Sequence, residues 1–446
     1  MAKTAYVVKE YSTISEGLLG EPPANGIEVD SKNFQDFVVF IEENEKNSDT
    51  SSAFSMFRSK GRRHIKVKNH VGVIETRTGC SLEILPKIFA ANGQSEFGYE
   101  ETKSLFLKML AALRASPFID MSQASLKAME KFPLLEIFIT AYLTQVESLL
   151  KRELRGDYQQ VRESLHYVKG KVLVSETMRQ NLQVKAEVVC EYDVFTTDIA
   201  PNRLIKSTLR KLLTITSSFQ NKKEIHRFLA IFASVSDSSD FERDLAYCNS
   251  NRAHLGNYGQ LIIWSELYLQ NKGLTNFKGS TVNQAILFPM EKVFEQYVGR
   301  LLVKYADVAK VELQHRKHHL LSQNKSNLTN DFSVKKFRLK PDFVLNDGEY
   351  ILDTKWKMLN LNSRQNDISE SDVYQMHAYG RTFQSLSEAT ETPRTCLIYP
   401  CNPQFKTKLN RMRFGNDLLL DVVPFDLANL DVKSEVKRLI DTVMAS

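Results

Sequence analysis

Residues 339–356, LKPDFVLNDGEYILDTKW, contain two short apolar runs separated by the dipeptide Asp347-Gly348. An Asp-Gly pair between two such runs is a strong signal for a β-hairpin with a two-residue turn. A two-residue turn fixes the register of the two strands and places Asp342 directly opposite Asp353. The segment therefore predicts a hairpin on which two carboxylates face each other.

The chemistry of this hairpin depends on what compensates the two negative charges. Opposed side chains in a sheet lie about 4.5–5.5 Å apart at Cβ, where like charges repel. A Mg²⁺ ion bound by Asp342 and Asp353 would remove the repulsion, because Mg²⁺ typically takes one or two carboxylates together with waters and substrate phosphate. Lys355 shares the face of Asp353, whereas Thr354 points away, and the lysine could stabilise charge on a phosphate or position the attacking water. The alternative is an ordinary hairpin with solvated carboxylates.

A helix and a further strand are expected to follow the hairpin. Residues 369–372 have the spacing of a capping box, which predicts that a helix begins there. On that helix Gln375 and Tyr379 are four residues apart and share a face, so that they could reach a phosphate or the waters of a metal. An amphipathic helix that packs its tyrosine on the core explains the same spacing. Residues 395–399 then predict a buried strand, giving the order hairpin, helix, strand.

Length and composition are those of a folded protein with more than one domain. The chain has 446 residues, of which 42% are hydrophobic and 25% are charged, enough for two or three cores. Its formal charge of +6 would assist an encounter with a polyanion but does not establish one. Five cysteines are scattered without a CxxC pair, which favours buried reduced thiols over disulfides or a zinc site.

Two absences in the sequence limit the function further. The first residues lack the apolar region of a signal peptide, and the longest apolar stretch is too short to cross a bilayer. We therefore expect a cytoplasmic protein without membrane contact. No GxxxxGK[ST] loop is present, so any nucleotide hydrolysis must be done by another chain.

The rest of the chain predicts an α/β multidomain protein with three parts. Residues 1–160 are expected to form a β-rich module followed by helices, residues 161–275 a mixed, mainly helical middle domain, and residues 276–446 an α/β domain with a mixed central sheet. Apolar positions from Phe288 to Val298 predict the first helix of the last part, and 308–313 predict a strand. Residues 42–52 and 322–330 are polar and are expected to be loops.

Several motifs of the last part resemble the PD-(D/E)xK nucleases, and specifically the McrC family of methylation-dependent restriction systems. The motifs are Pro341-Asp342, Asp353-Thr354-Lys355 and residues 372–379 (DVYQMHAY). Blocks elsewhere agree with the same family and occur in its order: 71–74 (VGVI), 82–88 (LEILPKI), 202–206 (NRLIK) and 288–295 (FPMEKVFE). The resemblance spans most of the chain from about residue 65.

This resemblance implies a Mg²⁺-dependent endonuclease that acts on double-stranded DNA together with a McrB-like AAA+ GTPase oligomer. The partner would bind the GTP, and this chain would bind the partner through its N-terminal module and stimulate GTP hydrolysis. By the same resemblance Asp342, Asp353, Lys355, Gln375 and Tyr379 belong to the catalytic site. Glu295 would complete the metal site, although it also fits an exposed helical glutamate. A non-catalytic adaptor that activates the partner and bridges it to DNA remains the alternative.

Three clusters of charge are left with two interpretations each. The basic stretch 58–68 could contact phosphates or an acidic groove of the partner, or it could be the charged edge of a sheet. Lys336, Arg338 and Lys340 could guide a DNA backbone towards the metal, or they could form a plain solvated strand face. The histidines at 315, 318 and 319 have spacings suited to a metal site only if helical, and otherwise form a basic surface cluster.

Overall fold

The computed structural model divides the chain into two compact units, residues 1–133 with 273–446, and residues 134–272. It describes residues 5–17, 26–43, 53–59, 61–76, 78–88, 98–113, 116, 118, 129–152, 154–181, 187–269, 282–306, 310–327, 330–386, 392–415 and 417–445. The boundary expected at residue 160 lies inside the second unit, whereas the one expected at residue 275 lies close to the end of that unit at residue 272. The first and last parts of the chain share a unit because a strand that begins at residue 282 pairs with a strand of the N-terminal sheet.

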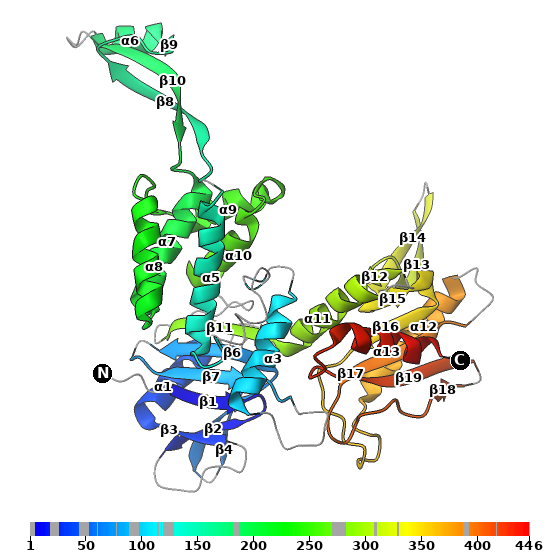
Figure 1. The fold of residues 1–446 in the computed structure, drawn as a ribbon. Coiled ribbons are helices and arrows are strands. Elements are labelled where there is room, and N and C mark those ends of the chain that lie inside the picture. Colours follow the sequence, from blue (N-terminus) through cyan, green and yellow to red (C-terminus); the bar gives the residue numbers. More distant parts are fainter. Residues whose placement is uncertain are drawn as a thin grey trace. The chain divides into compact units, whose positions relative to one another are not determined.

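A six-stranded mixed sheet forms the centre of the C-terminal part (Figure 1). Its strands, in spatial order, are β12 (Val311–Leu313), β15 (Phe343–Leu345), β16 (Tyr350–Thr354), β17 (Arg394–Pro400), β19 (Leu418–Phe425) and β18 (Met412–Phe414). The β16–β17 and β17–β19 pairs are parallel, and the other pairs are antiparallel. The mixed α/β architecture and the strand at 395–399 were predicted, and the structure confirms both.

The predicted hairpin is β15 and β16. Phe343 pairs with Leu352 and Leu345 with Tyr350, so the predicted register is confirmed and its extension brings Asp342 opposite Asp353. The prediction of a two-residue turn was wrong. The turn spans residues 346–349, and a short 3₁₀ segment, η2 (Asn346–Gly348), closes it. Asn346 and Asp347 both adopt a positive φ, a conformation that Asn and Asp tolerate better than other non-glycine residues. This allows a four-residue turn that keeps the same pairing of the strands.

Helices cover both faces of the sheet. The helix α12 (Glu370–Leu386) packs against β16, β17 and β19 and buries Met376, Tyr379 and Phe383 in a core with strand residues of that face. The opposite side carries α11 (Met290–Tyr305) and α13 (Val432–Met444), which pack against each other. Phe288, expected on the first helix, lies on the preceding strand instead, because the chain completes a sheet pairing before the helix begins at Met290.

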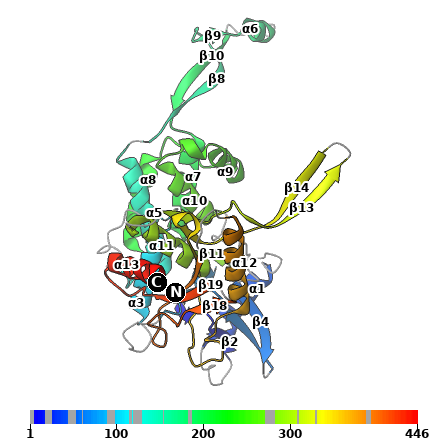
Figure 2. The same cartoon turned by 90° about the vertical axis from the view of Figure 1, so that its right-hand side faces the viewer.

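A long two-stranded hairpin precedes the β15–β16 hairpin in the sequence. Its strands are β13 (His319–Asn327) and β14 (Asn330–Arg338), and Figure 2 shows them extending away from the six-stranded sheet. The prediction of a polar loop over 322–330 was wrong. The sequence over 322–330 is polar and lacks the apolar alternation by which strands are recognised. We call residues 315–340 the β-arm.

Two four-stranded sheets form the N-terminal part of the same unit. The first has the order β1 (Ala5–Lys9), β7 (Ser81–Leu85), β6 (His70–Thr76) and β11 (Val282–Pro289), and the second has the order β3 (Gly26–Asp30), β2 (Thr13–Gly17), β5 (Arg62–Val67) and β4 (Phe54–Ser59). The helices among the described residues of this part are α1 (Ser31–Glu43) and α3 (Tyr99–Ala111). The β-rich character was therefore predicted correctly. Most of the expected acidic loop, residues 44–52, lies outside the described residues.

Gly72 is required by the close approach of two strands. Its φ is +147°, and a Cβ atom there would lie 1.9 Å from the carbonyl oxygen of Ile286 on β11. We expect Gly72→Ala to lower the free energy of unfolding by about 2–4 kcal/mol, since backbone must move to relieve the overlap. Gly79→Ala is the matched control, because Gly79 has a φ of +86° but nothing within 4 Å of a Cβ. Urea unfolding that shows equal losses for both variants would contradict this account.

The second unit combines a helical bundle with a small sheet. Its helices are α5 (Leu134–Leu150), α7 (Ala200–Ile215), α8 (Phe219–Ile231), α9 (Phe241–Ser250), the 3₁₀ turn η1 (Arg252–His254) and α10 (Tyr258–Leu269). The sheet consists of β8 (Asp157–Leu165), β10 (Val188–Thr196) and β9 (Lys171–Val172), with α6 (Val174–Asn181) beside them. The mixed, mainly helical character expected for the middle of the chain agrees with this unit.

Two further expectations concern thiols and membranes. All five cysteines are buried and free, which confirms the prediction of reduced thiols. In the part of the chain that the structure describes, every helix is too short or too polar to span a bilayer.

Candidate functional site

Asp342 and Asp353 lie at the end of the central hairpin and differ in how they are held. Thr354 donates two hydrogen bonds to Oδ2 of Asp342, from its backbone nitrogen at 2.7 Å and from its hydroxyl at 2.6 Å. Asp353 is only 2% exposed. Burial and the negative charge of Asp342 raise the pKa of Asp353 to about 7. Burial also raises the pKa of Asp342, although the bonds from Thr354 oppose it.

A chain of polar contacts connects Asp353 to the helix α12. Nζ of Lys355 lies 2.7 Å from Oδ2 of Asp353 and donates a hydrogen bond of 2.9 Å to Oε1 of Gln375. The amide nitrogen of Gln375 donates to the hydroxyl of Tyr379 at 2.7 Å. Gln375 and Tyr379 share a helix face, as predicted, and that face is turned towards the lysine.

Lys355 is held in its charged form. Burial alone would lower the pKa of Lys355, but the carboxylates of Asp353 and Asp372 outweigh it and the net pKa lies above the ordinary lysine value. Asp372 lies 3.6 Å from Nζ of Lys355 and accepts a hydrogen bond from Tyr399. We did not single out Asp372 or Thr354 as site residues from the sequence, although both stand inside the quoted motifs.

Glu295 reaches the same region from α11. Its Oε1 accepts a hydrogen bond of 2.9 Å from Gln314, whose backbone nitrogen donates to the carbonyl oxygen of Asp342 at 2.8 Å. Burial, and after it the charge of Asp342, raise the pKa of Glu295. Glu295 is therefore half-buried next to the acidic pair, and it differs from the exposed helical glutamate of the alternative interpretation.

The residue after the lysine connects the site to the N-terminal sheet. The indole nitrogen of Trp356 donates to both carboxylate oxygens of Glu10, at 2.9 and 3.0 Å. Glu10 is buried at the end of β1, and burial raises its pKa to about 7. Trp356 also packs on Phe294, with ring centroids 5.4 Å apart. These contacts fix the backbone beside Lys355 and Glu295. They could not be predicted from local patterns, because 346 positions separate Glu10 from Trp356.

The acidic pair suits a hard divalent cation. Among the described residues, no three His, Cys, Asp or Glu side chains are grouped so that they could hold a metal by themselves. Mg²⁺ does not need such a group, because it keeps several waters and takes oxygens from the substrate. Together Asp342 and Asp353 provide two carboxylates against the one ammonium of Lys355, and burial, followed by the charge of Asp342, raises the pKa of Asp353. Asp342 and Asp353 could thus hold Mg²⁺.

The basic stretch 58–68 and the histidines at 315 and 318 make contacts that do not include the acidic pair. Arg62 and Arg63 of the basic stretch form ion pairs with Glu28 and Glu16 at 3.7 and 3.3 Å, and β4 is an edge strand, which fits the charged-edge interpretation. The rings of His315 and His318 pack against the ring of Phe383 in a tilted and an edge-to-face arrangement, with ring centroids 5.1 and 4.6 Å apart. The spacing of these histidines would suit a metal site only on a helix, and neither residue belongs to a helix. The structure therefore does not support the interpretation as a metal site. Lys60 lies outside the described residues.

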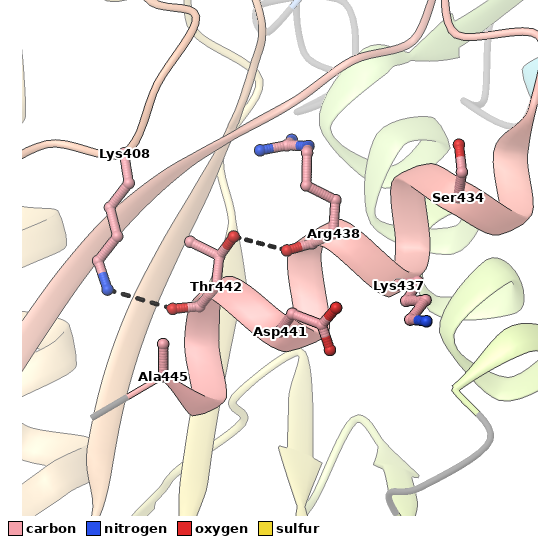
Figure 3. A pocket seen from close by; sticks show the side chains of 7 residues that line it. All are labelled: Lys408, Ser434, Lys437, Arg438, Asp441, Thr442 and Ala445. Atoms are coloured by element: carbon pink, nitrogen blue, oxygen red, sulfur yellow. Dashed lines mark hydrogen bonds between the residues drawn. The ribbon is translucent and has the colours of Figure 1, made fainter.

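A cavity of about 590 Å³ lies beside α13, away from the acidic pair (Figure 3). In Figure 3 the ammonium of Lys408 donates a hydrogen bond to the carbonyl oxygen of Thr442. The hydroxyl of Thr442 donates a hydrogen bond to the carbonyl oxygen of Arg438. Lys408 also pairs with Asp421 at 3.0 Å, and Arg438 pairs with Glu435 at 2.6 Å. Since these charges are already compensated within the protein, the cavity has no evident part in the chemistry of the hairpin.

Comparison with solved structures first defines the class of the fold. The chain superposes on a chain of the refined half-complex from the tetradecameric assembly of Thermococcus gammatolerans McrB AAA+ hexamers with bound McrC, with a TM-score of 0.68 and 16% sequence identity, covering 99% of this chain and 100% of that one. The cryo-EM structure of the Thermococcus gammatolerans McrBC complex gives a TM-score of 0.47 and 18% identity over 68% of this chain and 88% of that one. No curated protein matches the sequence.

The family follows from the sequence model. A model described as McrBC 5-methylcytosine restriction system component matches residues 65–400, which is more than half of the chain. The protein belongs to the McrBC family of restriction-system components. This confirms the resemblance inferred from the motifs.

The raised pKa of Asp353 leads to a pH dependence of metal binding. In the metal-free protein Asp353 takes up a proton as the pH falls through about 7, and this proton competes with a cation. We expect the affinity for Mn²⁺ to fall by up to about tenfold per pH unit below that value. The pKa of Asp353 is higher in the folded protein than in the unfolded chain, so the ionisation of Asp353 lowers the free energy of unfolding as the pH rises towards 7. A bound cation stabilises the ionised carboxylate and removes this destabilisation. Calorimetric titration of the full chain at pH 6, 7 and 8 measures the effect, and a constant affinity would contradict it.

Proposed function

We propose that this chain is the Mg²⁺-dependent DNA endonuclease subunit of a McrBC-like restriction complex and hydrolyses phosphodiester bonds. The observation that carries the proposal is the arrangement of Asp342, Asp353 and Lys355 at the end of one central hairpin. It combines two carboxylates suited to Mg²⁺ with a charged lysine 2.7 Å from one of them. Membership of a restriction-system family supports the same function.

Each residue of the site has a distinct role in this proposal. Asp342 and Asp353 would hold Mg²⁺, which when bound polarises the scissile phosphate and lowers the pKa of water. Thr354 fixes one oxygen of Asp342 by two hydrogen bonds. Lys355 places its ammonium where charge develops on the phosphate and where the attacking water is oriented.

The helix residues act on the lysine and the acidic pair. Gln375 accepts a hydrogen bond from Lys355, and Tyr379 accepts one from Gln375. Both are therefore positioning residues for the ammonium, a narrower role than the catalytic one expected from the sequence. Glu295, half-buried beside Asp342, would bind a water of the metal or complete its ligands.

The partner of this chain is proposed to be a McrB-like AAA+ GTPase oligomer. The similar solved assembly, that of Thermococcus gammatolerans McrB AAA+ hexamers with bound McrC, supports this choice. The chain would stimulate GTP hydrolysis by the partner and bring double-stranded DNA to its own site. The sheet β8–β10–β9 exposes the large apolar side chains of Tyr158 and Phe195, and the connection between β8 and β9 exposes Val168. Such exposure supports a protein contact there. The expected partner-binding region, 1–160, includes only the first residues of this sheet.

One observation favours the alternative of a non-catalytic adaptor. The ammonium of Lys355 lies 2.7 Å from Asp353 and 3.6 Å from Asp372, so part of the negative charge is compensated without a metal. An adaptor with a vestigial acidic pair would show the same ion pair.

Two readouts from one reaction separate the two functions. The full chain, its partner, GTP and Mg²⁺ are incubated with supercoiled plasmid, and DNA cleavage and GTP hydrolysis are followed together. The nuclease proposal predicts stimulated GTP hydrolysis with cleavage, and loss of cleavage alone when both Asp342 and Asp353 are replaced by Asn. Stimulated GTP hydrolysis without any cleavage by the wild type, on methylated or unmethylated plasmid, would establish the adaptor instead.

A further inference from the structure

The β-arm contains the entire excess of positive charge in this chain. Residues 315–340 include seven Lys and Arg residues and one Asp, a net formal charge of +6. The whole chain also has a net charge of +6, so all other residues together are neutral. A charge excess confined to 26 consecutive residues marks a local surface for a polyanion rather than a general property of the protein.

The shape of the β-arm suits a duplex. Each strand has nine residues, so the ribbon is roughly 30 Å long. Residues 335–338 and Lys340 are exposed, as are Leu320 and Leu321 on the partner strand. A two-stranded ribbon of this kind fits the major groove of B-DNA, which is about 12 Å wide, and its exposed lysine and arginine side chains can contact the phosphates that border the groove.

Both strands of the β-arm are attached to the acidic pair. β14 ends at Arg338, four residues before Asp342, and Leu339 between them is buried in the core under α12. The segment leading into β13 contains Gln314, whose backbone nitrogen bonds to the carbonyl oxygen of Asp342 at 2.8 Å. A duplex held by the β-arm is therefore held next to the site where a phosphate would be cut.

A strained residue marks the base of the β-arm. Phe337 has a φ of +57° within β14 and is 68% exposed. The pairing between the strands skips Phe337 and Leu320, while Arg338 pairs with His319 and Lys336 with Leu321. Such a backbone conformation costs free energy and is typically kept at binding or catalytic sites. In the β-arm, the positive φ of Phe337 interrupts the alternation of side chains between Lys336 and Arg338, at the point where the ribbon leaves the core.

We propose that the β-arm is the DNA-holding element of this chain, which binds the phosphate backbone of double-stranded DNA beside Asp342 through Lys335, Arg338 and Lys340. This proposal rests on the proposed nuclease function for its choice of ligand. Of the two interpretations that the sequence left open for the basic residues before Asp342, it chooses contact with a DNA backbone over a plain solvated strand face.

The test uses the full chain with Lys335→Gln, Arg338→Gln and Lys340→Gln combined, and a 30-base-pair duplex labelled for fluorescence anisotropy. Ca²⁺ replaces Mg²⁺ so that binding is measured without cleavage. We expect binding to weaken at least about tenfold, and the slope of log K against log salt to fall by about 2–3, since each lost phosphate contact removes about 0.9. Cleavage at limiting DNA should fall in parallel. The charge-matched control combines Arg58→Gln, Lys66→Gln and Lys68→Gln on β4, β5 and the following residue, and should bind nearly as the wild type.

The outcomes separate this inference from the proposed function. Wild-type binding and salt slope in the β-arm variant, with cleavage still dependent on Asp353, would overturn the inference alone. An equal loss in the control would assign the effect to net charge and overturn it as well. Normal DNA binding with lost stimulation of the partner GTPase would make the β-arm a protein contact and refute the proposal. Arm-dependent DNA binding without cleavage by the wild type would refute the nuclease function and leave the inference standing.

Discussion

Replacing Asp353 with Asn should abolish DNA cleavage while leaving the fold and the stimulation of the partner GTPase intact. The substitution keeps the size of a side chain that is 2% exposed but removes one of two carboxylates available to a cation. We expect the cleavage rate to fall by at least about 10²–10³-fold, the usual cost of losing one charge-stabilising group. Single-turnover cleavage of plasmid with the partner and GTP measures the fall, and calorimetry with Mn²⁺ should show lost or greatly weakened binding.

The same hairpin offers a matched control for this variant. Asp347 in the turn is exposed and pairs with Lys310 at 2.5 Å. Asp347→Asn makes the same chemical change on the other end of the hairpin, and exposed ion pairs contribute little to stability. It should cut DNA at the wild-type rate. Full cleavage by Asp353→Asn would exclude Asp353 as a ligand, and equal losses in both variants would show that the hairpin itself had been damaged.

Replacing Lys355 with Met should separate cleavage from metal binding. The long apolar side chain fills the same volume but lacks the ammonium that lies 2.7 Å from Asp353. We expect cleavage to fall by about 10²–10³-fold, because the group that stabilises developing charge is gone. Mn²⁺ should bind at least as tightly as to the wild type, since the ammonium no longer competes for the same carboxylate.

Lys310→Met is the control for the lysine variant, because it removes the other member of the exposed pair with Asp347. Its cleavage rate and its Mn²⁺ affinity should both match the wild type. If Lys355→Met lost Mn²⁺ binding as completely as Asp353→Asn, the lysine would serve to hold the carboxylate in place and would have no separate part in the reaction.

The local parts of this site could be predicted from the sequence. The Asp-Gly pair and its apolar flanks fixed the pairing of Phe343 with Leu352 even though the turn proved longer than expected. The spacing of Gln375 and Tyr379 placed them on one helix face, and both are in the hydrogen-bond chain from Lys355. These predictions succeeded because they rest on the periodicity of a strand and of a helix over a few residues.

The parts that could not be predicted depend on contacts between distant positions. Glu10 meets Trp356 across 346 positions, and β11 joins a sheet whose other members all precede residue 86, which changed the division of the chain. Residues 322–330 were mistaken for a polar loop because their sequence has no apolar alternation. In the first two cases the contacts that decide the structure come from a partner far away in the sequence, and no local pattern reports them.

The central claim is that Asp342 and Asp353 share one cation, and anomalous scattering from crystals of the full chain grown with Mn²⁺ tests it directly. The account predicts an anomalous peak bound by an oxygen of Asp342 and an oxygen of Asp353, present in the wild type and absent in Asp353→Asn. Crystals at neutral pH that diffract well and show no peak between these carboxylates, with Lys355 still paired to Asp353, would contradict it.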